Sequence, residues 1–167
     1  MSKRKPIEEA QIDRRIEFLI KEANSDTPFK DQTVTFALRV ITNFLAVNDD
    51  VQSRKLSRNC KYRSKEAHKL FLSNPDGWLD EVTNEHQYPI KRAWDWIYDN
   101  RAVLTVDLVK DHLKKWPIVV VTKKKNKTLK DDPNIPPDRR YLNAGIEVLK
   151  KNGSGEWEPV STREISN

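Results

Sequence analysis

The chain has 167 residues, of which 37% are hydrophobic and 34% charged, and its 31 Lys and Arg exceed its 25 Asp and Glu to give a net charge of +6. This length fits one domain with a hydrophobic core, and five Trp, four Tyr and five Phe argue against a disordered chain. The single cysteine, Cys60, excludes an internal disulfide and a zinc site built on cysteines. We expect it to be a small buried residue rather than a catalytic thiol.

No apolar run approaches the roughly 20 residues that cross a bilayer, and no apolar segment follows the basic N-terminus. We therefore expect no membrane segment and no signal peptide. A lone cysteine fits the reducing cytoplasm, which is the expected location. A basic surplus favours polyanionic partners, nucleic acid first, although solubility alone also explains such a charge.

Apolar residues at helical spacing predict two helices in the first third of the chain. The first spans residues 6–23 and carries a stripe of aliphatic side chains. The second spans about residues 31–47, although its many β-branched residues disfavour a helix. Polar, turn-forming runs at 24–28 and 48–50 end the two helices.

A cation-rich stretch follows at residues 53–69, where Glu66 is the only acidic residue. Ser64 predicts the N-cap of a short helix over residues 65–73, which a turn-forming Asn-Pro-Asp-Gly sequence ends. Residues 78–83 alternate apolar and polar side chains, a pattern that predicts a strand.

The second half of the chain mixes helices with strands. The predicted elements are helices over 90–100 and 106–115, a β-branched strand over 117–122, and a hairpin with strands over 145–149 and 157–160. Together the elements predict an α+β fold, with a helical N-terminal half packed on a small C-terminal mixed sheet. We expect a single domain over residues 1–167, with the helical part at about 6–73 and the α/β part, which holds the candidate site, at about 78–161.

One short motif points to chemistry: Glu85-His86-Gln87-Tyr88-Pro89, placed before the aromatic-rich helix. Hydrolysis of a phosphodiester needs a base, for which an imidazole is suited at neutral pH, and a divalent cation that bears the developing charge. Magnesium prefers oxygen ligands, so a carboxylate is its natural anchor. Adjacent side chains of a strand point to opposite faces, so Glu85 and His86 need a turn to act on one substrate.

The motif from Glu85 to Pro89 resembles the start of HNH nucleases, also called His-Me finger or ββα-metal nucleases. The resemblance implies a metal-dependent endonuclease in which Glu85 binds Mg²⁺ or another divalent cation and His86 is the general base. It also implies a downstream Asn that orients the imidazole and a second metal ligand on a later helix. Asn100 and His112 are the candidates for these two roles.

A wider pattern is similar to small bacterial and phage proteins of unassigned function. It combines the Glu85 motif with a Val-rich strand that ends in Thr-Lys, and with the sequence Arg-Tyr-x-x-Ala-Gly-Ile at residues 140–146. This similarity implies no particular activity.

Two basic clusters flank the motif in the sequence. Lysines and arginines neutralise phosphates and release counterions, and interleaved aromatic residues such as Tyr62 and Trp116 stack on unpaired bases. The candidate nucleic-acid-binding residues are Arg54, Lys55, Arg58, Lys61, Arg63, Lys65, Lys123, Lys124, Lys125 and Lys127. The clusters also fit a solvated surface. Nucleic acid is the expected partner, with DNA favoured over RNA.

Other interpretations stay open. Glu85 and His86 also fit surface positions at a strand-to-helix junction, where the carboxylate stabilises the helix N-terminus, and His112 also fits a half-buried helix residue. In a non-enzymatic DNA- or RNA-binding or regulatory module, the basic clusters would act and the motif would be incidental. A protein-interaction adaptor of a phage or host-defence system would use an exposed Trp96. The sequence does not specify the oligomeric state.

Overall fold

The computed structural model describes residues 8–47, 53–129 and 131–160, without the side chains of residues 53–55. The chain divides into two compact units, and each is made of two separate segments. The helical unit comprises Met1–Val51 and Tyr88–Lys114, and the sheet unit comprises Gln52–Gln87 and Lys115–Asn167.

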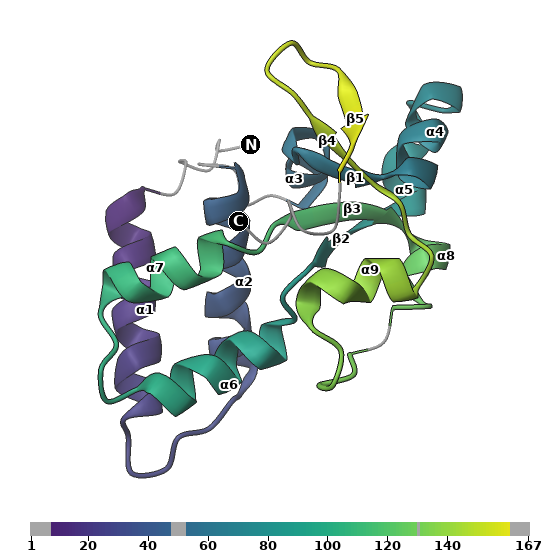
Figure 1. The fold of residues 1–167 in the computed structure, drawn as a ribbon. Coiled ribbons are helices and arrows are strands. Elements are labelled where there is room, and N and C mark those ends of the chain that lie inside the picture. Colours follow the sequence, from purple (N-terminus) through teal and green to yellow (C-terminus); the bar gives the residue numbers. More distant parts are fainter. Residues whose placement is uncertain (1–7, 48–52, 130, 161–167) are drawn as a thin grey trace. The chain divides into compact units, whose positions relative to one another are not determined.

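The helical unit is a packed group of amphipathic helices (Figure 1). Its helices are α1 (Glu9–Ala23), α2 (Gln32–Val47), α6 (Ile90–Asn100) and α7 (Val106–Lys114). Aliphatic side chains at helical spacing meet in its core, among them Ile16 of α1, Leu38 of α2, Ile97 of α6 and Val109 of α7. Burying each such side chain contributes roughly 1.5–3 kcal/mol. The four helices predicted in these regions are confirmed, while Pro6 lies outside the described residues.

Within the described residues, the sheet unit holds one five-stranded mixed sheet with the strand order β2-β3-β1-β4-β5. The strands are β1 (Tyr62–Ser64), β2 (Val82–His86), β3 (Ile118–Thr122), β4 (Val148–Lys151) and β5 (Trp157–Pro159). β1 and β3 are parallel, and the other neighbouring strands are antiparallel. β3 is buried along its first four residues, as its unbroken β-branched run predicts.

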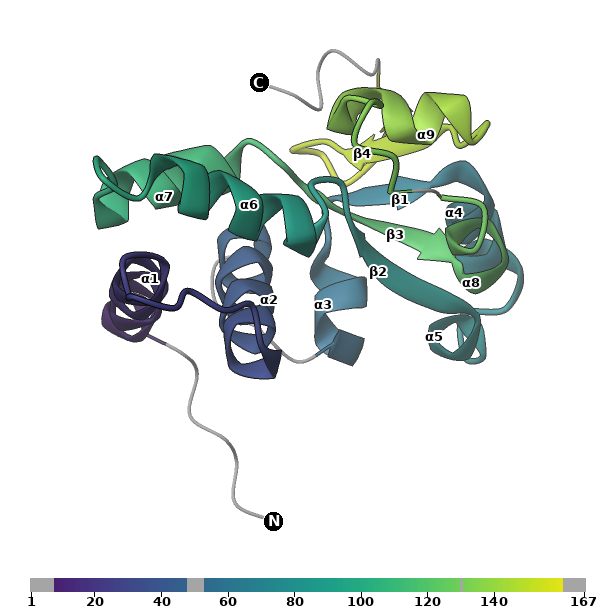
Figure 2. The same ribbon diagram turned by 90° about the horizontal axis from the view of Figure 1, so that it is seen from below.

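Short helices cover both faces of this sheet. They are α3 (Ser53–Asn59), α4 (Lys65–Ser73), α5 (Trp78–Glu81), α8 (Lys123–Asn126), the 3₁₀ turn η1 (Pro137–Arg139) and α9 (Arg140–Asn143). Figure 2 shows α9 on one side of the sheet and α3 and α5 on the other. On the α9 side, Tyr141 packs with Val119 and Val121. On the other side, the Ser57 hydroxyl of α3 lies 2.8 Å from the Asn84 side-chain oxygen of β2.

Gly145 ends α9 with a positive φ of 62°. The Ile146 N–H donates to the Tyr141 carbonyl at 2.8 Å, and the Gly145 N–H donates to the Leu142 carbonyl at 3.0 Å. This is the Schellman arrangement, which needs a left-handed residue just past the helix. The turn sends the chain from α9 directly into β4.

The α+β class predicted from the sequence is confirmed, with helices concentrated in the N-terminal half and a mixed sheet completed by the C-terminal half. The short helix over 65–73 is also confirmed, and the Ser64 hydroxyl accepts the Ala67 N–H at 3.1 Å as its cap. The strand over 117–122 and the C-terminal hairpin form close to their predicted positions.

The strand predicted over 78–83 is wrong. Residues Trp78–Glu81 form the helical turn α5, and the strand begins only at Val82. The reason is packing, because Trp78 is fully buried and its indole N–H donates to the Ala67 carbonyl of α4 at 2.8 Å. An alternation of six residues was too short to outweigh that contact.

The observed units also differ from the predicted division of the chain. Residues 53–73, expected in the helical part, belong to the sheet unit, and residues 90–114, expected in the α/β part, belong to the helical unit. None of the helices in the described ranges is long and apolar enough to span a membrane.

Candidate functional site

The register of β2 places Glu85 and His86 on opposite faces of the sheet. Glu85 lies opposite Val119 of β3, and His86 lies opposite Ile118. Directly opposed side chains share a face, and successive side chains alternate between faces. Glu85 and His86 therefore lie in a regular strand and not at a turn that would bring the carboxylate and the imidazole together.

The Glu85 carboxylate is held by two donors from α9. One oxygen accepts the Arg140 guanidinium at 3.1 Å, and the other accepts the Tyr141 hydroxyl at 2.7 Å. Burial raises the pKa of Glu85, and the charge of Arg140 and the bond from Tyr141 oppose that rise. Burial, with the neighbouring Glu85 charge, raises the pKa of the fully buried Tyr141 phenol well above its usual value.

Arg140 joins the end of β2 to α9 through more than the ion pair. Its guanidinium also donates to the carbonyl of His86 at 3.0 Å and to the carbonyl of Gln87 at 2.9 Å, and its side chain is 4% exposed. Planar, multidentate contacts of this kind are typical of arginine in a buried structural position. The Glu85–Arg140–Tyr141 cluster thus connects residues far apart in the sequence.

The other two residues expected at the nuclease site lie in the helical unit. The Asn100 amide donates to the carbonyl of Trp96 at 2.8 Å, one turn earlier in α6. The His112 ring stacks on Trp96 at 3.7 Å with a 5° angle between the planes, and the Tyr88 ring meets it edge-on at 5.2 Å. Trp96 is partly buried in this stack, whereas the adaptor interpretation expected an exposed Trp96.

The residues present do not fit the divalent cation that the HNH resemblance implies. Both oxygens of Glu85 already accept hydrogen bonds, and its neighbour His86 faces the other side of the sheet. In the parts of the chain that the structure describes, no group of three or more His, Cys, Asp or Glu side chains is arranged to hold a metal ion. We therefore derive no catalytic step through a metal.

Arg63, expected to contact phosphate, is instead buried in an aromatic cage. Its guanidinium carbon lies 4.4–4.7 Å from the ring centroids of Phe71, Trp78 and Trp157. Burial lowers the pKa of Arg63 to about 10. Cation–π contacts stabilise the charge there, so Arg63 packs the interior rather than meeting solvent. Cys60 is also buried, as expected, and burial raises the pKa of its thiol to about 12.

The remaining predicted cations divide into engaged and exposed side chains. Lys65 forms an ion pair with Glu147 at 2.7 Å, and the Lys123 ammonium donates to the Asp80 carbonyl at 2.6 Å. Lys125 is partly buried. The exposed cations are Arg58, Lys61, Lys123, Lys124 and Lys127. The side chains of Arg54 and Lys55 lie outside the described residues.

A cleft of about 840 Å³ lies along the β4–β5 hairpin of the sheet unit. The residues that line it are Lys61, Lys150, Lys151, Asn152, Gly153, Glu158, Pro159 and Val160. Its one carboxylate, on Glu158, accepts the Asn152 amide at 2.5 Å. The Lys150 ammonium also lies 5.9 Å from the ring centroid of Tyr62. The cleft thus combines three lysines with a nearby aromatic side chain.

Strand pairing holds these lysines in place. The Lys151 N–H donates to the Lys61 carbonyl at 2.8 Å, which joins the start of β1 to the end of β4. Lys150 lies opposite Tyr62 in the same antiparallel pair. A site built on paired strands is positioned more precisely than a site on a free loop.

The positive charge of the chain belongs to the sheet unit. This unit holds 18 Lys and Arg against 12 Asp and Glu, whereas the helical unit holds 13 of each. The net charge of +6 therefore comes entirely from the sheet unit. A field of one sign concentrated on one unit attracts polyanions to that unit.

Sequence reasoning missed the two features that carry this site. Lys150 and Lys151 lie just after the predicted strand over 145–149, and nothing in their spacing indicates the cleft that Lys61 completes. Arg140 and Tyr141 belong to the familiar Arg-Tyr-x-x-Ala-Gly-Ile sequence, which was the available signal for a link with the Glu85 motif.

No protein-family model, no curated protein and no solved structure matches this chain. The likeness of the Glu85 motif to HNH nucleases therefore rests on the motif alone.

Proposed function

We propose that the chain binds nucleic acid through the sheet unit, with the phosphate backbone in the cleft along the β4–β5 hairpin. The observation that carries the proposal is the cleft itself, which is lined by Lys61, Lys150 and Lys151 and by a single carboxylate, that of Glu158. Lysine side chains that neutralise phosphates release counterions, which supplies affinity without sequence preference. The surplus charge of the sheet unit supports the same partner.

The Tyr62 side chain favours single-stranded over duplex nucleic acid. Its ring lies beside the Lys150 ammonium and is partly exposed. Single-stranded sites typically join a cationic groove to aromatic rings on which unpaired bases stack. DNA and RNA both present these two features, so the choice between them is left to experiment.

Cleavage of the bound strand, as an HNH-like endonuclease would perform it, stays a prediction. The bonds of Glu85 to Arg140 and Tyr141 support a structural role for this residue, and so does the orientation of His86. Incubation of bound single-stranded DNA and RNA with Mg²⁺, with EDTA and with the His86→Ala variant tests it. Metal-dependent cleavage lost in that variant would establish the endonuclease.

Binding is tested by fluorescence anisotropy with labelled single-stranded DNA and RNA of about 20 nucleotides at low salt. Replacing the three cleft lysines by glutamate in one variant should weaken binding roughly 100-fold, because attraction to phosphate becomes repulsion. The matched control reverses Lys21, Lys91 and Lys114, three exposed lysines of the helical unit, and has the same net charge.

The control variant should retain binding within about threefold, since only the overall field changes. Equal losses in the two variants would show that net charge alone governs binding and would remove the cleft from the proposal. Absence of binding by the wild type at low salt would overturn the proposed function itself.

A further inference from the structure

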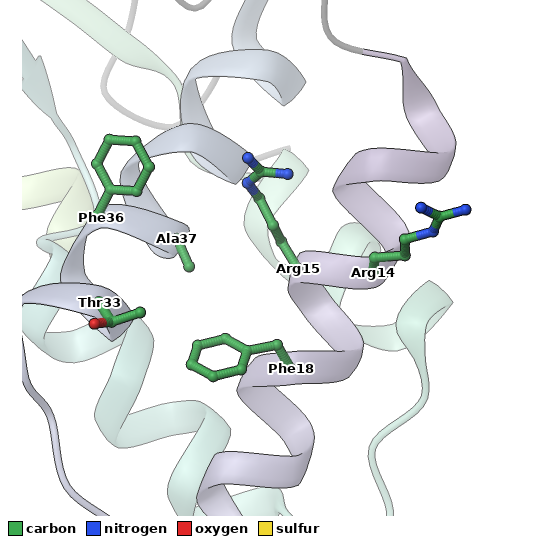
Figure 3. Close-up of a pocket in the computed structure, with 6 residues that line it drawn as sticks. All are labelled: Arg14, Arg15, Phe18, Thr33, Phe36 and Ala37. Atoms are coloured by element: carbon green, nitrogen blue, oxygen red, sulfur yellow. The ribbon is translucent and has the colours of Figure 1, made fainter.

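We propose that a groove between α1 and α2 of the helical unit is the docking site for an acidic, amphipathic peptide segment of a partner protein. The groove has a volume of about 280 Å³ and is shown in Figure 3. Its lining residues are Arg14, Arg15, Phe18, Thr33, Phe36 and Ala37. This inference does not rest on the proposed nucleic-acid binding, because it concerns the other unit.

Helical spacing brings these side chains to one place. Arg14 and Arg15 precede Phe18 by four and three residues in α1, so all three lie on neighbouring positions of one helix surface. Thr33, Phe36 and Ala37 hold the corresponding spacing in α2. Figure 3 shows the Phe18 ring and the Arg15 guanidinium extending from α1 toward α2.

The two aromatic rings of the groove are exposed to solvent. Phe36 is 63% exposed and Phe18 is 37% exposed. A partner that covers these rings would remove apolar surface from water, which favours binding. Exposed aromatic side chains beside a groove are typical anchor sites for an amphipathic peptide.

The arginines specify the charge of the peptide. Arg15 donates to the Gln11 carbonyl of its own helix at 3.1 Å, which uses one of its five N–H groups. Within the described residues, neither Arg14 nor Arg15 forms an ion pair with a carboxylate. A carboxylate of a partner would complement Arg15, because arginine binds carboxylate in a bidentate geometry, whereas the Arg14 guanidinium extends away from α2 (Figure 3).

The walls of the groove favour a peptide over a nucleic acid. The methyl of Ala37 and the two phenyl rings accept a large apolar side chain, such as leucine or phenylalanine, without leaving polar atoms unpaired. A nucleic-acid base carries several polar groups that need hydrogen-bond partners. Among the lining residues, only Thr33 has a neutral side-chain hydroxyl, so most of these groups would stay unpaired, which opposes binding. The helical unit also lacks the charge surplus of the sheet unit.

The test is a selection from random peptides of about twelve residues displayed on phage, made against the full chain. We expect the enriched peptides to share a large apolar residue flanked by Asp or Glu, and to bind as synthetic peptides with micromolar Kd. Phe36→Ala and Arg15→Glu should each weaken that binding at least about tenfold. The matched controls Phe29→Ala and Arg39→Glu, which alter exposed residues outside the groove, should leave it unchanged.

Circular dichroism melts establish that all four variants are folded. Enrichment of no peptide, enrichment of peptides without acidic residues, or equal binding by Phe36→Ala and wild type would each overturn the proposal. Two further outcomes would assign the groove to another occupant and would also overturn the proposal. One is oligonucleotide binding that Arg15→Glu abolishes, and the other is a dimer, seen by light scattering, that Phe36→Ala dissociates.

Discussion

Glu85 is placed where burial opposes its ionisation while two donors from α9 stabilise the ionised form. Burial is the larger influence and raises the pKa of the carboxyl, and the Arg140 charge and the Tyr141 hydroxyl act in the opposite direction. Arg140 is itself 4% exposed and needs an anion beside it. At the scale of single residues, the acid of the Glu-His motif therefore acts as the counter-charge of a buried arginine.

Glu85→Ala should destabilise the fold by about 3–5 kcal/mol, because it leaves the Arg140 charge buried without a partner. The matched control is Glu147→Ala, which removes an exposed ion pair with Lys65 and should cost less than about 1 kcal/mol. Urea unfolding measures both values. A loss below about 1 kcal/mol for Glu85→Ala would contradict the structural role and would return this carboxylate to the endonuclease hypothesis.

His68 should make stability depend on pH. Burial, aided by the charge of Arg63, lowers the pKa of this imidazole below its ordinary value of 6.5, and its ring packs on Trp157 at 5.2 Å. The folded chain then binds fewer protons at His68 than the unfolded chain, so His68 protonation costs stability as pH falls below 6.5. Above that pH both states are neutral at this residue and the effect vanishes.

Urea unfolding at about pH 7.5 and pH 5 measures this effect against His68→Gln, which removes the titrating group. We expect the wild type to lose more stability than the variant on acidification. An equal loss in the two proteins would show that the packing of His68 does not disfavour its charged form.

At the scale of elements, the C-terminal end of α9 depends on Gly145. Gly145→Ala should destabilise the fold by about 1–2 kcal/mol, because an L side chain at a φ of 62° is strained even where space is open. Gly153→Ala is the control, since Gly153 also has open space but no positive φ, and it should change stability by less than about 0.5 kcal/mol. Equal effects, measured by thermal unfolding, would contradict the strain argument.

Elements with long periodic patterns could be predicted from the sequence. Short elements, which form only through tertiary contacts, could not. α1 and α7 follow from apolar residues at helical spacing, and β3 follows from its β-branched run. β1 has three residues and exists only through its pairing with β3 and β4. Likewise α5 forms where Trp78 is buried against α4, a contact that no local pattern contains.

The candidate site was less accessible to prediction than the fold for the same reason. Whether Glu85 meets His86 or Arg140 depends on the register of β2 and on the position of α9, which are tertiary properties. The cation-rich stretch correctly marked Lys61 as exposed. It also included Arg63, whose guanidinium is buried among aromatic rings that come from other elements.

At the scale of the whole molecule, the surplus positive charge and the exposed aromatic groove lie in different units. The sheet unit carries the entire surplus of +6 and the lysine cleft, while the helical unit is neutral in sum and carries the Phe18–Phe36 groove. A polyanion and an acidic peptide would thus meet separate surfaces. Neutral overall charge on the helical unit also keeps it from competing for the polyanion.

The most direct test of this account is the salt dependence of binding to single-stranded DNA. The slope of log K against log[KCl] should be about −2 for the wild type, because three cleft lysines each contribute roughly −0.7. Replacing Lys150 and Lys151 by glutamine should reduce the magnitude of the slope by about 1.4, with Lys61 left in place. A slope that these two substitutions leave unchanged would mean that the phosphates lie elsewhere on the chain and would contradict the central claim.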